Sequence, residues 1–199
     1  MMKTLSRVPS RRVLLCVSTV ALALPAIFGA PTPVEAAEAE AKQILKAMSD
    51  YVGAQKTISF DFDASLEVVT NDEQKLSLAS SGTVALSRPG SIRATRAGGH
   101  ADIEILYDGK TVTLLGKGTN LYTQIPLTGT LDKLVDELRE KYKRPLPAAD
   151  LVLANSYDAL MEDVIDVKDL GSGVINGVEC DYLAFRKKAL DFQIWIAQG

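Results

Sequence analysis

Residues 57–69 alternate almost perfectly between polar and apolar side chains. The apolar set is Ile58, Phe60, Phe62, Ala64, Leu66 and Val68, and the polar set between them is Ser59, Asp61, Asp63, Ser65 and Glu67. A period of two residues places the two sets on opposite faces of a β-strand. A long strand of this kind requires a sheet that has one face in water and the other face against apolar groups.

The segment that follows predicts five more strands, at residues 75–87, 91–97, 101–107, 110–115 and 121–125. Asp108-Gly109 is a strong signal for a two-residue hairpin turn. Ser80 and Gly82 interrupt the large apolar side chains of the second strand, which predicts a bulge or a bend of the sheet there. Residues 57–125 are therefore interpreted as an antiparallel meander of six strands.

Helical periodicity occurs on both sides of this meander. Residues 37–51 predict a helix that ends at Gly53, and residues 130–142 predict a second, amphipathic helix. The apolar stripe of the second helix is Leu131, Leu134, Val135, Leu138 and Tyr142. Short helices are predicted at 148–154 and 157–161. Strands then return at 164–170, 173–175, 178–186 and 190–197, with a hairpin turn at Asn176-Gly177.

Runs of strands that are separate from runs of helices are typical of an α+β fold. About ten strands in one open sheet would curl strongly. We therefore expect a curved antiparallel sheet, an incomplete β-barrel, with an N-terminal helix and a helical lid inserted between strands. Because the inserted helices are few and are broken by prolines, they would cover the concave apolar face only in part. Apolar surface under such a cover predicts a lipid site. The alternative is that the helices fill the apolar face, which is then simply core.

The first 36 residues have the pattern of a secretory signal peptide. Four basic side chains precede an apolar run over residues 13–30: Lys3, Arg7, Arg11 and Arg12. Cleavage is expected after Ala36, and Pro25 and Gly29 argue against the alternative that the run stays in the membrane as an anchor. Ser10-Arg11-Arg12 resembles the twin-arginine export motif, but paired arginines also occur in ordinary leaders, so both routes stay open. Either route predicts a periplasmic protein with a single domain at 37–199.

The charge balance limits the partners. The whole chain has a net charge of −3, of which residues 1–36 contribute +3, so residues 37–199 carry about −6. An acidic domain argues against nucleic acid, which needs clustered positive charge. Outside the leader, no apolar run reaches the roughly 18 residues of a membrane span. Cys180 is the only cysteine after residue 36 and is interpreted as a small buried residue on a strand, with an intermolecular bond or thiol chemistry as the alternative.

No group of residues predicts catalysis, a cofactor or a metal. His100, the only histidine, lies beside two glycines and is interpreted as a solvated loop residue. Asp61 and Asp63 share the polar face of a strand, but a metal site needs further ligands at fixed spacing. No serine or cysteine lies in a recognisable nucleophile motif. The sequence therefore predicts that the protein is not an enzyme.

Two sequence segments carry a resemblance to a known family. Residues 82–93 read G-T-V-A-L-S-R-P-G-S-I-R, and residues 107–114 read Y-D-G-K-T-V-T-L. This strand pair and hairpin resemble the LolA/LolB superfamily of periplasmic lipoprotein carriers over roughly residues 37–138. Residues 177–186 and 193–196 resemble a branch of predicted periplasmic proteins within that superfamily. Two tryptophans of the family pattern are absent from this sequence. Ala94 occupies one of the two positions, and Leu114 or Leu115 occupies the other.

The resemblance implies a hydrophobic cavity for acyl chains under a helical lid. Strand parity assigns to the concave face the cavity residues Phe60, Phe62, Leu66, Ile103 and Ile105. The lid would be the helix at 131–142 together with the segment at 147–161, and its apolar residues would be Leu131, Leu134, Val135 and Leu138. The family's arginine before proline, which ties the lid to the barrel, would be Arg88. The chain is accordingly expected to bind a lipid or lipoprotein acyl chain non-covalently, as a carrier or chaperone with transient membrane contact. The alternative is a ligand-free module that contacts or senses an envelope protein.

Overall fold

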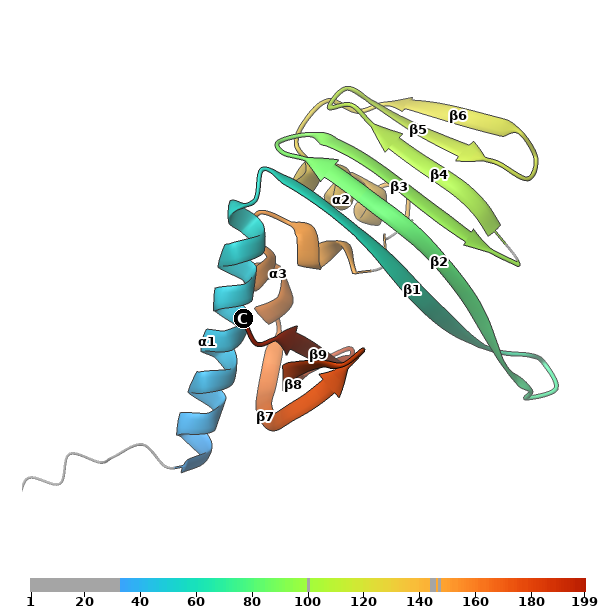
Figure 1. The fold of residues 1–199 in the computed structure, drawn as a ribbon. Helices are drawn as coiled ribbons and strands as arrows, with labels where there is room; N and C mark the ends of the chain where they lie inside the picture. The colour runs from blue at the N-terminus through green and yellow to red at the C-terminus, as the bar shows by residue number, and fades with distance from the viewer. Residues whose placement is uncertain (1–32, 100, 144–145, 147) are drawn as a thin grey trace, which may run out of the picture. The chain divides into compact units, whose positions relative to one another are not determined.

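The structure is a computed structural model that describes residues 33–199 except residues 100, 144, 145 and 147 (Figure 1). Residues 1–32 of the predicted signal peptide lie outside the described residues, and the predicted cleavage point after Ala36 falls within the first helix. The elements are α1 (Pro33–Ala54), β1 (Thr57–Val69), β2 (Lys75–Ser87), β3 (Ser91–Gly98), β4 (Ala101–Tyr107), β5 (Thr111–Gly116), β6 (Leu121–Pro126), α2 (Leu131–Glu140), η1 (Ala149–Val152), α3 (Ser156–Met161), β7 (Val164–Ile175), β8 (Val178–Lys187) and β9 (Asp191–Ala197). Helices and antiparallel strands occur in separate runs, which confirms the predicted α+β class.

Strands β1 to β6 form one sheet in which each strand pairs antiparallel with the next. The predicted six-stranded meander is therefore confirmed. Its edges are β1 and β6, which do not pair with each other, so the sheet is open. At the β4–β5 hairpin, Gly109 has a φ of 88°, and the Asp108 carboxylate accepts hydrogen bonds from the backbone N–H groups of Lys110 and Thr111. The turn thus uses a glycine and a short polar side chain. It is longer than the predicted two-residue turn, because Tyr107 pairs with Val112 and residues 108–111 lie between them.

Gly82 lies where the sequence predicts a bulge or a bend. The register of β1 against β2 runs through Phe62 and Gly82 without a shift, so this pair contains no bulge. The pairing of β2 with β3 is interrupted at residues 82–83 and 95–96 and then resumes in the same register. A Cβ atom on Gly82 would lie 2.0 Å from the carbonyl oxygen of Thr95 and 2.7 Å from Cζ of Phe62. Only glycine fits this close approach of the two strands.

Strands β7, β8 and β9 form a second antiparallel sheet. Residues 164–170 and 173–175, predicted as two strands, are one strand, because β7 continues through Gly171 with an irregular register between Asp169 and Ser172. Asn176 and Gly177 have φ angles of 52° and 81°. Positive φ at both positions is what a type I′ turn requires, which confirms the predicted hairpin.

The prediction of one sheet of about ten strands is wrong. The nine strands in the described part of the chain divide into sheets of six and three, and neither sheet closes into a barrel. A period of two residues identifies a strand but does not specify which strand it pairs with. Here α2, η1 and α3 separate β6 from β7 in the chain, and the two groups of strands pair only among themselves.

Helix α1 covers one face of the second sheet. Its Leu45 is fully buried in a core that also contains Phe185 of β8. The helix continues past Gly53, its predicted end, to Ala54. A Cβ atom on Gly53 would lie 2.9 Å from the carbonyl oxygen of Ala154, so this glycine serves close packing and not helix termination. None of the described helices combines the length and apolar character that a membrane span needs.

Candidate binding surface on the six-stranded sheet

One face of the six-stranded sheet is apolar, and we call it the apolar face. Its side chains lie in rows across the strands, because residues that are directly opposite in an antiparallel pair share a face. The large apolar members are Ile58, Phe60, Phe62, Leu66 and Val68 of β1, Leu76, Leu78, Val84 and Leu86 of β2, Ile92 of β3, Ile103, Ile105 and Tyr107 of β4, Val112 and Leu114 of β5, and Leu121 and Ile125 of β6. All five predicted cavity residues belong to this face.

Helix α2 covers one end of the apolar face (Figure 1). The buried core beneath it contains Leu131, Leu134 and Leu138 of α2 together with Leu86, Tyr107 and Val112 of the sheet. The hydroxyl of Thr130 caps the helix by accepting a hydrogen bond from the backbone N–H of Lys133. The backbone N–H of Leu131 donates to the carbonyl oxygen of Pro89 at 2.8 Å. These bonds fix the start of α2 beside the β2–β3 turn.

The other end of the apolar face is not covered. The exposed fraction is 39% for Phe60, 49% for Leu66 and 39% for Leu114. Phe62 and Ile103 are half-buried, whereas Ile105 packs against the core under α2. Helix length explains the difference. The 10 residues of α2 span about 15 Å, whereas the 13 residues of β1 span about 43 Å.

The cover consists of more than α2. Val135, predicted to belong to the lid stripe, packs in a separate buried cluster with Ala149 and Leu153. Arg139 of α2 also forms an ion pair with Asp150 of η1. The helix thus uses one side for the sheet and another for residues 149–153. The movement that a lid requires stays a prediction.

Arg88 links the sheet to the helices through backbone carbonyl groups. Its Nε donates to the oxygen of Gln55 at 3.1 Å, and its Nη2 donates to the oxygens of Val152 at 2.8 Å and Val52 at 3.5 Å. Val52 lies in the last turn of α1, where carbonyl groups lack partners within the helix, and Val152 lies in η1. The arginine assigned as a latch therefore contacts the segment assigned to the lid, and its function as a latch stays a prediction.

Glu104 on the opposite, polar face is held between two cations. Its exposed fraction is 7%. The Nε of Arg93 donates to its Oε1 at 2.6 Å, and the Nζ of Lys117 lies 3.4 Å from its Oε2. The hydrogen bond from Arg93 lowers the pKa of the Glu104 carboxyl group, although burial acts in the opposite direction. A carboxylate with two cationic partners is electrostatically satisfied, so we assign it to the stability of the sheet.

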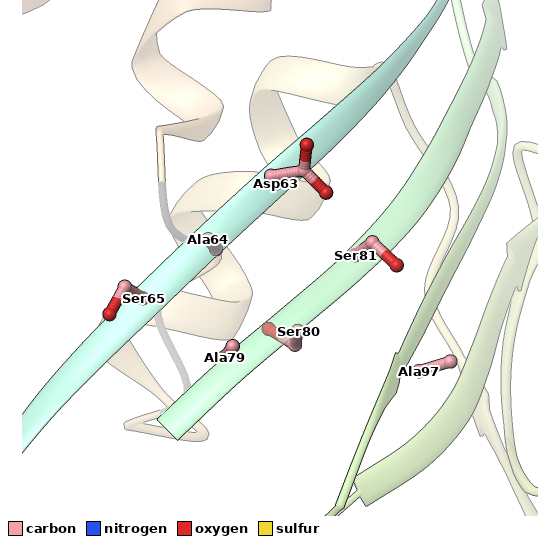
Figure 2. A pocket seen from close by; sticks show the side chains of 7 residues that line it. All are labelled: Asp63, Ala64, Ser65, Ala79, Ser80, Ser81 and Ala97. Carbon is pink, nitrogen blue, oxygen red and sulfur yellow. The ribbon is translucent and has the colours of Figure 1, made fainter. Parts of the chain in front are cut away.

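Two open hollows lie on the polar side of the sheet. The first has a volume of about 540 Å³ and extends over β1, β2 and β3 (Figure 2). It is lined by Asp63, Ala64, Ser65, Ala79, Ser80, Ser81 and Ala97. The second has a volume of about 500 Å³ and includes Ser59, Ala85 and Arg93. Neither hollow is lined by the predicted cavity residues, which lie on the other side of the sheet.

Of the remaining side chains that the sequence singled out, the structure describes Cys180, Asp61 and Asp63. Cys180 is free and buried on β8, as predicted, and His100 lies outside the described residues. Asp61 and Asp63 lie on the polar face of β1. Among the residues that the structure describes, no three His, Cys, Asp or Glu side chains gather as a metal site would need.

The two faces of β9 are covered differently. Phe192 packs in the core against α1 and stacks on Phe185. Trp195 lies on the opposite face, where it stacks on Tyr182 with 4.6 Å between ring centroids and remains 42% exposed. Helix α1 therefore covers one side of this strand.

Sequence reasoning assigned no role to Arg96, which also lies on the apolar face. Arg96 and Arg93 lie on opposite faces of β3, because their positions have opposite parity. The parity of Arg96 matches Ile92 and Ala94, which belong to the apolar face. An arginine at an apolar position of a strand is the signal that identifies it.

The protein is thus of the α+β class, with an open antiparallel sheet whose apolar face is only partly covered. The chain belongs to the family described as "Predicted periplasmic protein (DUF2092)", whose model matches residues 41–199. The protein is periplasmic, as its leader predicts. It is also similar to a solved structure, a DUF1329 family protein from Desulfovibrio piger ATCC 29098, with 11% identity, a TM-score of 0.33, and coverage of 81% of this chain and 69% of that one. No curated protein matches the chain, and none of these matches confirms the resemblance to LolA and LolB.

Proposed function

We propose that this protein binds the acyl chain of a lipid or lipoprotein on the uncovered end of its apolar face, as a non-enzymatic carrier or chaperone in the periplasm. The observation that carries the proposal is the exposure of Phe60, Leu66 and Leu114, which share one face of one sheet. Soluble proteins rarely keep large contiguous apolar patches in water unless the patch binds something.

The chemistry of the surface suits hydrocarbon. Its side chains are mainly Phe, Leu, Ile and Val, which offer dispersion contacts and few hydrogen bonds. Each methylene group moved out of water contributes about 0.8 kcal/mol. Ten such groups would contribute roughly 8 kcal/mol, from which the costs of ordering the chain and of association are subtracted. Affinity is therefore expected to increase with the length of the chain.

The cover offers a route for release. Helix α2 and residues 149–153 pack on each other and are tied to the sheet by Arg88. Displacement of this cover would expose the row of Leu86, Tyr107 and Val112 and extend the apolar surface. In the proposed cycle, a change in the cover alters the contact with the acyl chain and so controls loading and release.

The first test is mass spectrometry of lipids extracted from protein purified from the periplasm under native conditions. The expected result is an acyl species in near-stoichiometric amount. Ligand-free protein that also fails to bind acyl chains added in solution would contradict the proposal. That outcome would favour the alternative, a module that contacts an envelope protein without a ligand.

The second test compares two neighbouring positions of β1 that lie on opposite faces. Phe60→Ser removes an exposed ring from the apolar face, and Asp61→Asn changes the polar face by a few atoms. Binding of neutral ten- to fourteen-carbon acyl probes is expected to weaken about tenfold or more in Phe60→Ser and to stay unchanged in Asp61→Asn. If both variants bound the probes equally well, the apolar face would not be the binding site.

A further inference from the structure

Arg96 is the only charged residue that the described strands place on the apolar face. It pairs with Ile103 of β4, and the register on its other side puts it opposite Gly82, next to the ring of Phe62. Its Nε donates to the hydroxyl oxygen of Ser80 at 2.9 Å. Its two terminal nitrogens form no hydrogen bond or ion pair with the described residues.

The other described arginines have stronger partners. Arg93, Arg139 and Arg186 pair with the carboxylates of Glu104, Asp150 and Asp191, and Arg88 donates to three carbonyl oxygens. Arg96 is half-buried among apolar side chains, and partial burial of a charge has a cost that grows where no partner compensates it. One neutral hydroxyl group gives Arg96 little compensation. Its position is therefore poorly explained by the stability of the sheet alone.

A guanidinium group is a fixed fork of donors that matches the oxygens of a carboxylate or a phosphate. Ser80 is 7% exposed, and its bond to Nε orients the side chain and leaves the terminal nitrogens available. Leu66 lies four residues beyond Phe62 along β1, a distance of about 13 Å. An acyl chain whose head group contacts Arg96 can therefore lie along the exposed apolar side chains.

We propose that the ligand of the apolar face is an anionic amphiphile, and that Arg96 binds its head group while the acyl chain lies on the uncovered end. This inference rests on the proposed function. It adds that the ligand is negatively charged and that Arg96 recognises its head group. The head group is an anionic oxygen group, either the carboxylate of a fatty acid or the phosphate of a phospholipid.

The test uses three probes with the same ten-carbon chain: decanoate, decyl phosphate and neutral decanol. Their affinities are measured by calorimetry for the wild-type protein, for Arg96→Gln and for Arg93→Gln, the matched control on the polar face of the same strand. The wild type is expected to bind at least one anionic probe about tenfold or more tightly than decanol. Arg96→Gln should remove that preference and leave decanol binding unchanged. Arg93→Gln should keep the preference.

The outcomes separate the two proposals. If the wild type binds all three probes equally, the inference about Arg96 is overturned and the proposed function stands. If it binds none of them, the proposed function fails as well. If Arg96→Gln weakens all three probes equally, the arginine has only a structural role. The wild-type contrast between charged and neutral probes needs no variant, so it decides the question even where Arg96→Gln folds poorly. The stronger of the two anionic probes identifies the head group.

Discussion

The two ends of the apolar face both carry large apolar side chains, but they differ in what covers them. Val112 and Leu114 lie two residues apart on β5, yet Val112 is 4% exposed and Leu114 is 39% exposed. The alternating sequence makes both of them apolar. The length and position of α2 decide which one becomes part of the core. One sequence pattern therefore produces a core at one end of the sheet and an exposed surface at the other.

The largest expected effect tests that contrast directly. Leu134→Ala removes a side chain that is 1% exposed under α2 and should lower the free energy of unfolding by about 2–5 kcal/mol. Leu66→Ala, at the uncovered end, should lower it by less than about 1 kcal/mol. Urea denaturation monitored by circular dichroism measures both. Equal losses would mean that the two ends are equally part of the core.

The second prediction concerns the attachment of the cover. Arg88→Met removes the donors to the carbonyl oxygens of Gln55 and Val152 and should lower the free energy of unfolding by about 1–3 kcal/mol. The control is Arg186→Met, because Arg186 and Asp191 form an exposed pair at 3.5 Å that should contribute about 0.5 kcal/mol or less.

Hydrogen exchange locates the effect of Arg88→Met. Faster exchange confined to residues 149–154 would show that Arg88 holds the cover in place. Faster exchange throughout the six-stranded sheet would instead show that Arg88 supports the whole fold, and the latch assignment would then be wrong.

Much of the meander could be predicted, because its information is local. The alternation of β1 and the turns at Asp108-Gly109 and Asn176-Gly177 depend on neighbouring residues. Strand parity alone brought Phe60 and Ile103 to one face. The division into two sheets could not be predicted, since pairing partners are chosen over long distances by packing that a local pattern does not contain.

The contacts of the candidate site show the same limit. The partners of Arg88 lie 33 to 64 residues away in the chain, beyond the reach of any pattern. The spacing of Val135 fits the apolar stripe of α2. Spacing alone does not show that one part of the stripe packs on the sheet and another part on residues 149–153. Arg96 could have been found, because its parity places a charge among apolar residues.

The third prediction concerns Glu104 on the polar face, where the buried side chain is charged and not apolar. The pKa of Glu104 is lower in the folded state because Arg93 and Lys117 favour the carboxylate. The pair therefore stabilises the fold at a pH above the unfolded value of about 4.3. That stabilisation is lost as the pH falls through the lower, folded-state pKa. Glu104→Gln should be less stable than the wild type by up to about 1 kcal/mol at neutral pH.

The measurement for Glu104 is urea denaturation of both proteins from pH 7 to the acid limit of the folded state. The difference in stability between them should shrink as the pH falls below the unfolded value. A difference that stays constant over this range would show that the loss in Glu104→Gln comes from packing and not from the charge of the carboxylate.

The smallest expected change in stability lies at the uncovered end and completes the comparison. Leu114→Thr keeps a residue suited to strands and places it opposite Thr123 of β6. Since Leu114 has no cover to lose, the free energy of unfolding should change by no more than about 0.5 kcal/mol. Fluorescence of a dye that binds exposed apolar surface should nevertheless fall. A substantial loss of stability together with unchanged dye binding would mean that Leu114 is part of the core, and that the apolar face offers less open surface than a ligand needs.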